Sequence, residues 1–235
     1  MFQYILFDLD GTLTDPGEGI TKSIRYAFEH YGVPVNSLDE LKVYIGPPLI
    51  QEMSARLGVD WETANQYVIK FRERYNTIGW KENHPIPGMK EALAALKEAG
   101  CKLAVATSKP LPTAMMVLEH FDMAKYFDAI CGSDPDGGNA DKAVIVRRAL
   151  DELGVTEEQK AQAVMVGDRM HDVVGGQKNG LTTVGLTMGY GSREEFADAG
   201  VSFVVDSAED MVSYLLGGSW NYCFKVPKEA SEEQK

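Results

Sequence analysis

The sequence is poor in cysteine and has no long apolar run. Its 235 residues include three cysteines, Cys101, Cys131 and Cys223, and none of them forms a CxxC pair. We therefore expect neither a disulfide framework nor a zinc site, and a reducing compartment such as the cytoplasm fits. No stretch approaches the ~20 consecutive apolar residues of a membrane span. The short apolar N-terminus also lacks the basic start of a signal peptide.

Basic residues are outnumbered by acidic ones. Lys and Arg together number 23 and Asp and Glu 35, so the formal net charge is −12. Nucleic-acid polymers and anionic membranes are held by Lys and Arg, and neither is expected as a partner. A small phosphorylated metabolite remains compatible, because a few local groups can hold it. The hydrophobic fraction of 44% is that of an ordinary globular protein, and a monomer and a dimer both stay open.

Short apolar runs alternate with helical patterns along most of the chain. The runs have the length of buried strands, and they occupy residues 4–7, 103–106, 129–131, 163–166, 183–185 and 203–205. The helical patterns space their apolar residues three or four apart, and two of them end at Gly100 and Gly154. Strands that alternate with helices form parallel sheets covered on both faces. We therefore predict an α/β fold with a doubly wound, Rossmann-like, mainly parallel sheet.

Residues 15–84 interrupt this alternation. Their apolar residues have helical spacing, and no clear strand pattern lies between the helices. The simplest architecture is an all-helical cap, residues 15–84, inserted into an α/β catalytic core made of residues 1–14 and 85–216. Residues 217–235 would form a C-terminal tail, and whether this tail packs back on the core is left open.

Polar residues gather where three of the predicted strands end. The clusters are Asp8-Leu9-Asp10-Gly11-Thr12, Thr107-Ser108-Lys109 and Gly167-Asp168-Arg169-Met170-His171-Asp172. A turn alone would explain any one of them, because turns favour Asp, Gly and Ser. In an open parallel sheet, however, ligands bind outside the carboxyl ends of the strands. Three such clusters together predict a functional site at this edge of the sheet.

Four carboxylates of these clusters, Asp8, Asp10, Asp168 and Asp172, would come close together at that edge. Two carboxylates ~4 Å apart repel each other by about 4 kcal/mol at an effective dielectric constant near 20. Either some of them are protonated or a cation lies among them. Oxygen ligands without imidazole or thiol suit Mg²⁺, and His171 is not expected to be a ligand. The sequence therefore favours Mg²⁺ as the cofactor.

These clusters, together with Lys142, resemble the four motifs of the haloacid dehalogenase superfamily of phosphohydrolases. Three further stretches are similar to its phosphoglycolate phosphatase and 5′-nucleotidase branch, which has a helical cap: Gly46-Pro47-Pro48-Leu49, Ala106-Thr107-Ser108-Lys109-Pro110 and Gly189-Tyr190-Gly191. The resemblance covers nearly the whole chain. It implies a Mg²⁺-dependent phosphatase that hydrolyses a small phosphomonoester, of the phosphoglycolate or nucleoside monophosphate class, through an aspartyl phosphate.

The resemblance also implies a role for each matching catalytic residue. Asp8 would attack phosphorus and become phosphorylated, and Asp10 would protonate the leaving alcohol and then deprotonate water. Thr107 would hydrogen-bond a phosphoryl oxygen, and Lys142 would neutralise charge on Asp8 and on the phosphoryl group. Lys109 is the competing lysine, and Lys142 is preferred because it opens a helix after the third strand.

Metal and substrate contacts complete the expected site. The Asp8 carboxylate, the Asp10 backbone carbonyl and Asp168 would bind Mg²⁺. Asp172 would contact the metal through a bound water, or would hydrogen-bond the groups that bind it. Thr12 would help to hold Asp10. The residues expected on the substrate side are Thr12, Ser108, Glu18 and Lys22, with Arg72 as a further candidate.

Two other functions stay open at this point. A phosphomutase of the same superfamily would keep Asp8 and Asp10 but return the phosphoryl group to a sugar. A phospho-acceptor signalling module also combines an acidic pocket, a Thr or Ser and a Lys on a parallel sheet, although it needs neither the helical insert nor Asp10. A dehalogenase is disfavoured, because its reaction has no oxygen leaving group for Asp10 to protonate.

Overall fold

The core of the molecule is one parallel sheet. The computed structural model describes residues 1–218, and within them six strands lie in the order β5-β4-β1-β6-β7-β8. The strands are β1 (Tyr4–Phe7), β4 (Lys102–Pro110), β5 (Ala129–Ser133), β6 (Ala163–Gly167), β7 (Thr182–Leu186) and β8 (Phe203–Val205). The neighbouring strands all pair in parallel. The α/β fold predicted from the sequence is confirmed.

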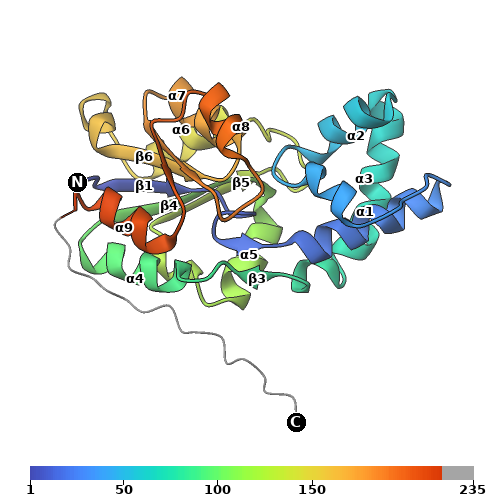
Figure 1. Cartoon of the computed structure of the whole chain (residues 1–235), viewed down its shortest axis with the longest axis horizontal. Helices are drawn as coiled ribbons and strands as arrows, with labels where there is room; N and C mark the ends of the chain where they lie inside the picture. Colours follow the sequence, from blue (N-terminus) through green and yellow to red (C-terminus); the bar gives the residue numbers. More distant parts are fainter. Residues whose placement is uncertain (219–235) are drawn as a thin grey trace, which may run out of the picture.

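Helices cover both faces of this sheet (Figure 1). One face carries α4 (Met89–Glu98), α5 (Leu111–His120) and α9 (Ala208–Leu215), and the other carries α6 (Lys142–Glu152), α7 (Met170–Lys178) and α8 (Arg193–Asp198). Alternate residues of β1 pack against the two helical layers, because successive side chains of a strand point to opposite faces of the sheet. Ile5 and Phe7 join the buried cluster of the first layer, and Leu6 joins that of the second. The strand therefore appears in the sequence as a continuous apolar run.

β4 extends further than the sequence predicted. The apolar run ends at Ala106, but the strand continues to Pro110, which pairs with Ser133 of β5 after a register shift. Irregular pairing of this kind changes the direction of side chains near the end of a strand. Residues 107–109 therefore lie on the strand itself rather than in a loop after it.

A helical layer lies beside the sheet, on the right in Figure 1. Its elements are α1 (Gly17–His30), α2 (Leu49–Leu57) and α3 (Trp61–Tyr75), with 3₁₀ segments η1 (Asp39–Tyr44) and η2 (Gly79–Lys81). These elements enclose a hydrophobic cluster of their own, which includes Phe28, Met53 and Phe71. The chain leaves the core at β2 (Thr14–Asp15) and returns at β3 (His84–Pro85), and the two pair antiparallel. We propose residues 15–84 as the cap, and both features support this boundary.

Further short 3₁₀ segments lie at η3 (Ala124–Tyr126) and η4 (Glu157–Gln162).

The described residues also bear on the expectations about membrane spans and cysteines. No helix within residues 1–218 is long and apolar enough to cross a bilayer. Cys101 and Cys131 are buried free thiols. Cys223 and the predicted tail beyond residue 218 lie outside the described residues.

Candidate active site

The turn after β1 carries two of the candidate catalytic residues. Backbone hydrogen bonds to the Leu9 carbonyl oxygen hold it together. Gly11 has φ +87°, and a Cβ added there would lie 2.1 Å from Asp168 Oδ2. Glycine alone accepts both this backbone conformation and this close approach without strain. The turn therefore brings Asp8 beside Asp168, which follows β6.

Lys142 is the cation at the centre of the site. It begins α6, and its Nζ lies 2.9 Å from Asp8 Oδ1 and 2.8 Å from Asp172 Oδ1. The ammonium also donates a 3.0 Å hydrogen bond to the Ala106 carbonyl oxygen. Burial by itself would lower the pKa of Lys142, but the Asp172 and Asp8 carboxylates raise it above its ordinary value. The structure thus places Lys142, and not Lys109, beside Asp8 as a charged ammonium.

Asp168 is fully buried and held by two hydrogen bonds. Its oxygens accept from Thr12 Oγ1 at 3.0 Å and from the Tyr190 backbone N–H at 2.9 Å. Thr12 therefore holds Asp168, where the sequence predicted that it would hold Asp10. Burial, with the Asp172 and Asp8 carboxylates close by, raises the pKa of Asp168 well above its usual range. Burial is also the main reason that the pKa of Asp172 rises to about 6.

Three carboxylates form a potential metal site. Oxygen atoms of Asp8, Asp168 and Asp172 lie within 4.8 Å of one another, and all three residues are buried. Within residues 1–218, Lys142 is the one cation that pairs with this group, through Asp8 and Asp172, so the charges do not balance when all three carboxylates are ionised. Carboxylate oxygens without thiol or imidazole suit Mg²⁺, and the donor set fits the predicted cofactor. Asp172 belongs to this group by position, whereas the Asp10 carboxylate does not.

Asp10 is held by a different lysine. Lys109 Nζ lies 2.6 Å from Asp10 Oδ2, and it donates a second hydrogen bond of 2.7 Å to the Tyr75 hydroxyl of α3. Burial raises the pKa of Asp10, and the Lys109 ammonium partly offsets this effect. Asp10 Oδ1 is buried and has no hydrogen-bond partner within residues 1–218. A carboxyl group in this state is suited to carry a proton to a ligand.

Two of the predicted hydroxyl residues, Thr107 and Ser108, lie on β4. Thr107 is buried, and its Oγ1 accepts a 3.3 Å hydrogen bond from the Lys109 backbone N–H. Its hydroxyl hydrogen can therefore be directed toward a ligand, as the predicted phosphoryl contact requires. Ser108 Oγ donates a 3.0 Å hydrogen bond to the Ala140 carbonyl oxygen, and Ser108 lines the cavity of the site.

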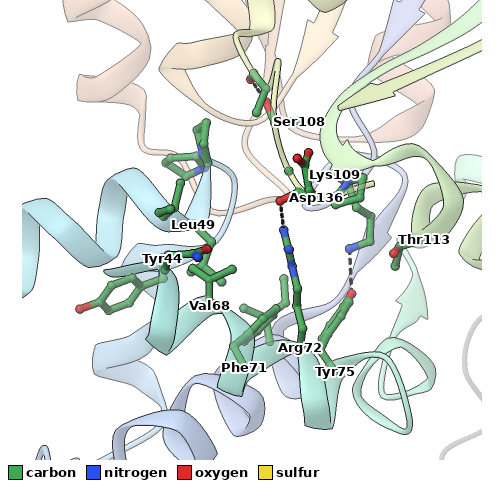
Figure 2. A pocket seen from close by; sticks show the side chains of 18 of the residues that line it. Tyr44, Leu49, Val68, Phe71, Arg72, Tyr75, Ser108, Lys109, Thr113 and Asp136 are labelled. Carbon is green, nitrogen blue, oxygen red and sulfur yellow. Dashed lines mark hydrogen bonds between the residues drawn. The ribbon is translucent and has the colours of Figure 1, made fainter. Parts of the chain in front are cut away.

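A cavity of about 610 Å³ lies between the cap and the core (Figure 2). The core contributes Asp10, Ser108 and Lys109 to its wall. The cap contributes mainly apolar and aromatic side chains, including Tyr44, Leu49, Val68, Phe71 and Tyr75. Arg72 of α3 also lines it, and donates a 2.6 Å hydrogen bond to the Asp136 carbonyl oxygen. The volume lies within the roughly 300–1,000 Å³ that is typical of small-molecule sites.

Glu18 and Lys22, predicted on the substrate side, lie elsewhere on the cap. Lys22 pairs with Glu18 one helical turn away and with Glu82 Oε1 at 3.1 Å. Glu82 is also paired with Arg74, whose Nη1 lies 2.7 Å from Glu82 Oε2. Neither Glu18 nor Lys22 belongs to the described residues that line the cavity. Of the three side chains predicted as cap contacts, Arg72 lines the cavity, as do Gly46, Pro47 and Pro48.

Some residues of the site were not singled out from the sequence. The spacing of α3 placed Tyr75 among core residues, although its hydroxyl accepts a hydrogen bond from Lys109. A buried tyrosine hydroxyl usually has a hydrogen-bond partner. A tyrosine on the apolar face of a predicted helix could therefore have indicated a polar contact at this position. Arg169 donates from Nη1 to the Ile45 carbonyl oxygen at 2.5 Å and thus links the start of α7 to the cap. No local pattern indicates that contact, because it joins distant parts of the chain.

Comparisons with known proteins agree with this geometry. A family model described as haloacid dehalogenase-like hydrolase matches residues 5–186. A 5′-nucleotidase of Pseudomonas aeruginosa is 43% identical over 195 residues, which are 81% of this chain and 85% of that protein. The tyrosine-protein kinase PtkA of Mycobacterium tuberculosis is 40% identical over 206 residues, 88% of this chain and 69% of that protein. A solved structure of a predicted phosphatase from Clostridium acetobutylicum has a TM-score of 0.88 and 40% identity, and covers 92% of this chain and 99% of its own. The chain therefore belongs to the haloacid dehalogenase-like hydrolase family.

Proposed function

We propose that this chain is a Mg²⁺-dependent phosphatase that hydrolyses a small phosphomonoester through a phosphorylated Asp8. The observation that carries the proposal is the contrast between two neighbouring aspartates. Each of them pairs with a lysine, Asp8 with Lys142 and Asp10 with Lys109. Of the two, Asp10 lines the cavity, where burial raises its pKa and its Oδ1 has no partner within the described residues. Environments that differ in this way suit one carboxylate to nucleophilic attack and the other to acid catalysis. The names of the relatives, 5′-nucleotidase and predicted phosphatase, support the same reaction.

In the first step, a carboxylate oxygen of Asp8 attacks phosphorus and forms an acyl phosphate. The bond between phosphorus and the ester oxygen breaks, and the proton of Asp10 moves to that oxygen, which leaves as an alcohol. The Lys142 ammonium stabilises the negative charge on the phosphoryl oxygens, and Thr107 donates a hydrogen bond to one of them.

In the second step, water attacks the phosphorus of the phosphorylated Asp8. Asp10, which is now a carboxylate, takes a proton from this water. The bond between phosphorus and Asp8 breaks, inorganic phosphate leaves, and both aspartates return to their starting states. The sum of the two steps is ester plus water giving alcohol plus phosphate.

The Asp8 carboxylate, the Asp10 backbone carbonyl and Asp168 would hold the Mg²⁺, and Asp172, whose carboxylate lies in the same group, would support it. The bound ion would supply charge neutralisation for the phosphoryl group. Burial and the neighbouring carboxylates raise the pKa values of Asp168 and Asp172, so a cation bound beside them would favour their ionised forms. Lys142 alone does not offset their charge.

Mg²⁺ binding is expected to weaken as the pH falls below about 6. A proton on Asp172, whose pKa lies at about 6, competes with the cation. For each proton that Mg²⁺ must displace, the Mg²⁺ concentration for half-maximal activity should rise by up to about tenfold when the pH falls by one unit. Because the folded-state pKa values are raised, the metal-free protein binds more protons than the unfolded chain and loses stability as the pH rises toward 6. Added Mg²⁺ should therefore raise the unfolding temperature more at about pH 8 than at about pH 5. A Mg²⁺ requirement and a thermal shift that are both independent of pH would contradict this assignment.

The leaving group would occupy the cavity between the cap and the core. Asp10 lines this cavity, so a proton can pass directly to an ester oxygen held there. Most of the wall is apolar and aromatic, which suits a nucleoside better than the small, charged glycolate group. Within the proposed class of substrates, we therefore favour a nucleoside monophosphate over phosphoglycolate.

A panel of phosphomonoesters tests the proposed function. It contains purine and pyrimidine nucleoside monophosphates, phosphoglycolate, a sugar phosphate and phosphotyrosine, the last because one relative is named a tyrosine-protein kinase. We expect inorganic phosphate to be released with many turnovers, and a chelator to stop the release until Mg²⁺ is restored. Isomerised sugar phosphate without free phosphate would indicate a phosphomutase. A stable phosphorylated protein without turnover would indicate a phospho-acceptor module.

A further inference from the structure

A buried chain of three polar groups joins the cap to the catalytic turn. Tyr75 ends α3 of the cap, Lys109 lies on β4 of the core, and Asp10 follows β1. The Lys109 side chain is 5% exposed, that of Asp10 13%, and Tyr75 4%. Figure 2 shows the Lys109 ammonium directed at the Tyr75 hydroxyl across the cavity. The ring of Tyr75 is fixed in turn by stacking on Phe71, with 5.0 Å between the ring centroids.

The three groups depend on one another. A buried ammonium is unfavourable unless its donors are satisfied, and Lys109 satisfies two of them with Asp10 Oδ2 and the Tyr75 oxygen. Lys109 is also the only cation within residues 1–218 that pairs with Asp10, because Lys142 pairs with Asp8 and Asp172 instead. The orientation of the Asp10 carboxyl group thus depends on a lysine that is itself held by the cap.

We propose that Tyr75 is a positioning residue that holds Lys109, and through it the proton donor Asp10, when the cap packs against the core. The inference rests on the proposed function, because it takes Asp10 as the acid of the first step. With Oδ2 held by Lys109, Oδ1, which has no partner within residues 1–218, is left to meet the ester oxygen. When the cap separates from the core, Lys109 loses the Tyr75 oxygen and Asp10 loses its fixed orientation. The cap thereby couples enclosure of the substrate to readiness of the acid.

Leaving-group dependence separates this role from a structural one. A nucleoside leaves from its monophosphate only if the ester oxygen is protonated, whereas p-nitrophenolate leaves without a proton. The ratio kcat/KM reports the steps up to formation of the phosphorylated Asp8, so the later hydrolysis of the acyl phosphate does not affect it. A residue that positions Asp10 should therefore matter for the first ester and not for the second.

The experiment compares Tyr75→Phe, Lys109→Met and the double variant on a nucleoside 5′-monophosphate and on p-nitrophenyl phosphate. On the nucleotide, we expect kcat/KM to fall about tenfold for Tyr75→Phe and about 100-fold for Lys109→Met, since general acids contribute about 10²–10⁴-fold. On p-nitrophenyl phosphate, each variant should stay within about threefold of the wild type. The double variant should match Lys109→Met alone, because Tyr75 acts only through Lys109. The control is Tyr67→Phe, on the same helix but packed inside the cap and away from the cavity.

Each outcome bears on the proposal. Equal losses on the two esters, or losses that multiply in the double variant, would overturn the positioning role while leaving the proposed function standing. Absence of phosphate release by the wild type from either ester would overturn the proposed function and this inference together. If thermal unfolding shows that Lys109→Met does not fold, Tyr75→Phe still decides, because it removes one hydroxyl group and keeps the buried ion pair.

Discussion

Replacing Asp8 with asparagine is expected to remove both turnover and the phosphorylated protein. The amide is nearly the same size as the carboxylate but is not a nucleophile, so no acyl phosphate can form. We expect kcat to fall by more than about 10⁴-fold, which corresponds to about 5 kcal/mol of activation free energy. Acid-quenched samples examined by intact-protein mass spectrometry should show a phosphoryl group on the wild type and none on Asp8→Asn.

Asp60→Asn is the matched control for this variant. Asp60 caps the N-terminus of α3 by accepting a 2.8 Å hydrogen bond from the Thr63 backbone N–H, and asparagine is an equally good cap. The control removes one carboxylate of the cap without touching the site, and it should keep wild-type rates. If Asp8→Asn retained rates similar to those of Asp60→Asn, the nucleophile would have to be assigned to another residue.

Asp10→Asn is expected to have a large effect that depends on the leaving group. Without the acid, kcat/KM on a nucleoside monophosphate should fall by about 10²–10⁴-fold. On p-nitrophenyl phosphate the loss should be small, because nitrophenolate departs unprotonated. The second step also loses its base, so phosphorylated Asp8 should accumulate during turnover of the nitrophenyl ester. Rapid quenching and mass spectrometry measure this accumulation.

The two aspartate variants are therefore distinguishable by their phosphorylated states. Asp8→Asn should show no phosphorylated protein on any ester, and Asp10→Asn should show more of it than the wild type on the nitrophenyl ester. A loss of equal size on both esters in Asp10→Asn, without accumulation, would contradict its role as acid and base. In that case, the free Oδ1 of Asp10 would have to serve binding rather than proton transfer.

The strands and the turn after β1 were predictable because the signals that specify them are local. An apolar run such as residues 4–7 can be buried only between two helical layers, and it ends where Asp8 begins. The close approach of Gly11 to Asp168 shows why three polar clusters at strand ends become one site: parallel strands bring their carboxyl ends to the same edge.

The contacts of the cap could not be predicted in the same way. Lys22 was expected at the substrate, but it pairs with Glu82. Lys22 lies near the start of the cap segment in the sequence and Glu82 near its end. Tyr75 belongs to the hydrophobic cluster of the cap, and its hydroxyl also accepts a hydrogen bond from Lys109 of the catalytic core. Both outcomes depend on how the cap packs, and helical spacing specifies only which face of a helix is apolar.

The sequence by itself determined the α/β fold, the family, and the clustering of Asp8, Asp168 and Asp172. These properties follow from apolar periodicity and from short motifs, in which the interacting residues are neighbours or lie at equivalent strand ends. The tertiary structure alone decided that Lys109 pairs with Asp10 and that a cavity lined mainly by apolar side chains lies between the cap and the core. The reason is that these features arise where two separately packed hydrophobic clusters meet, and the surface between them is made of residues distant in the sequence.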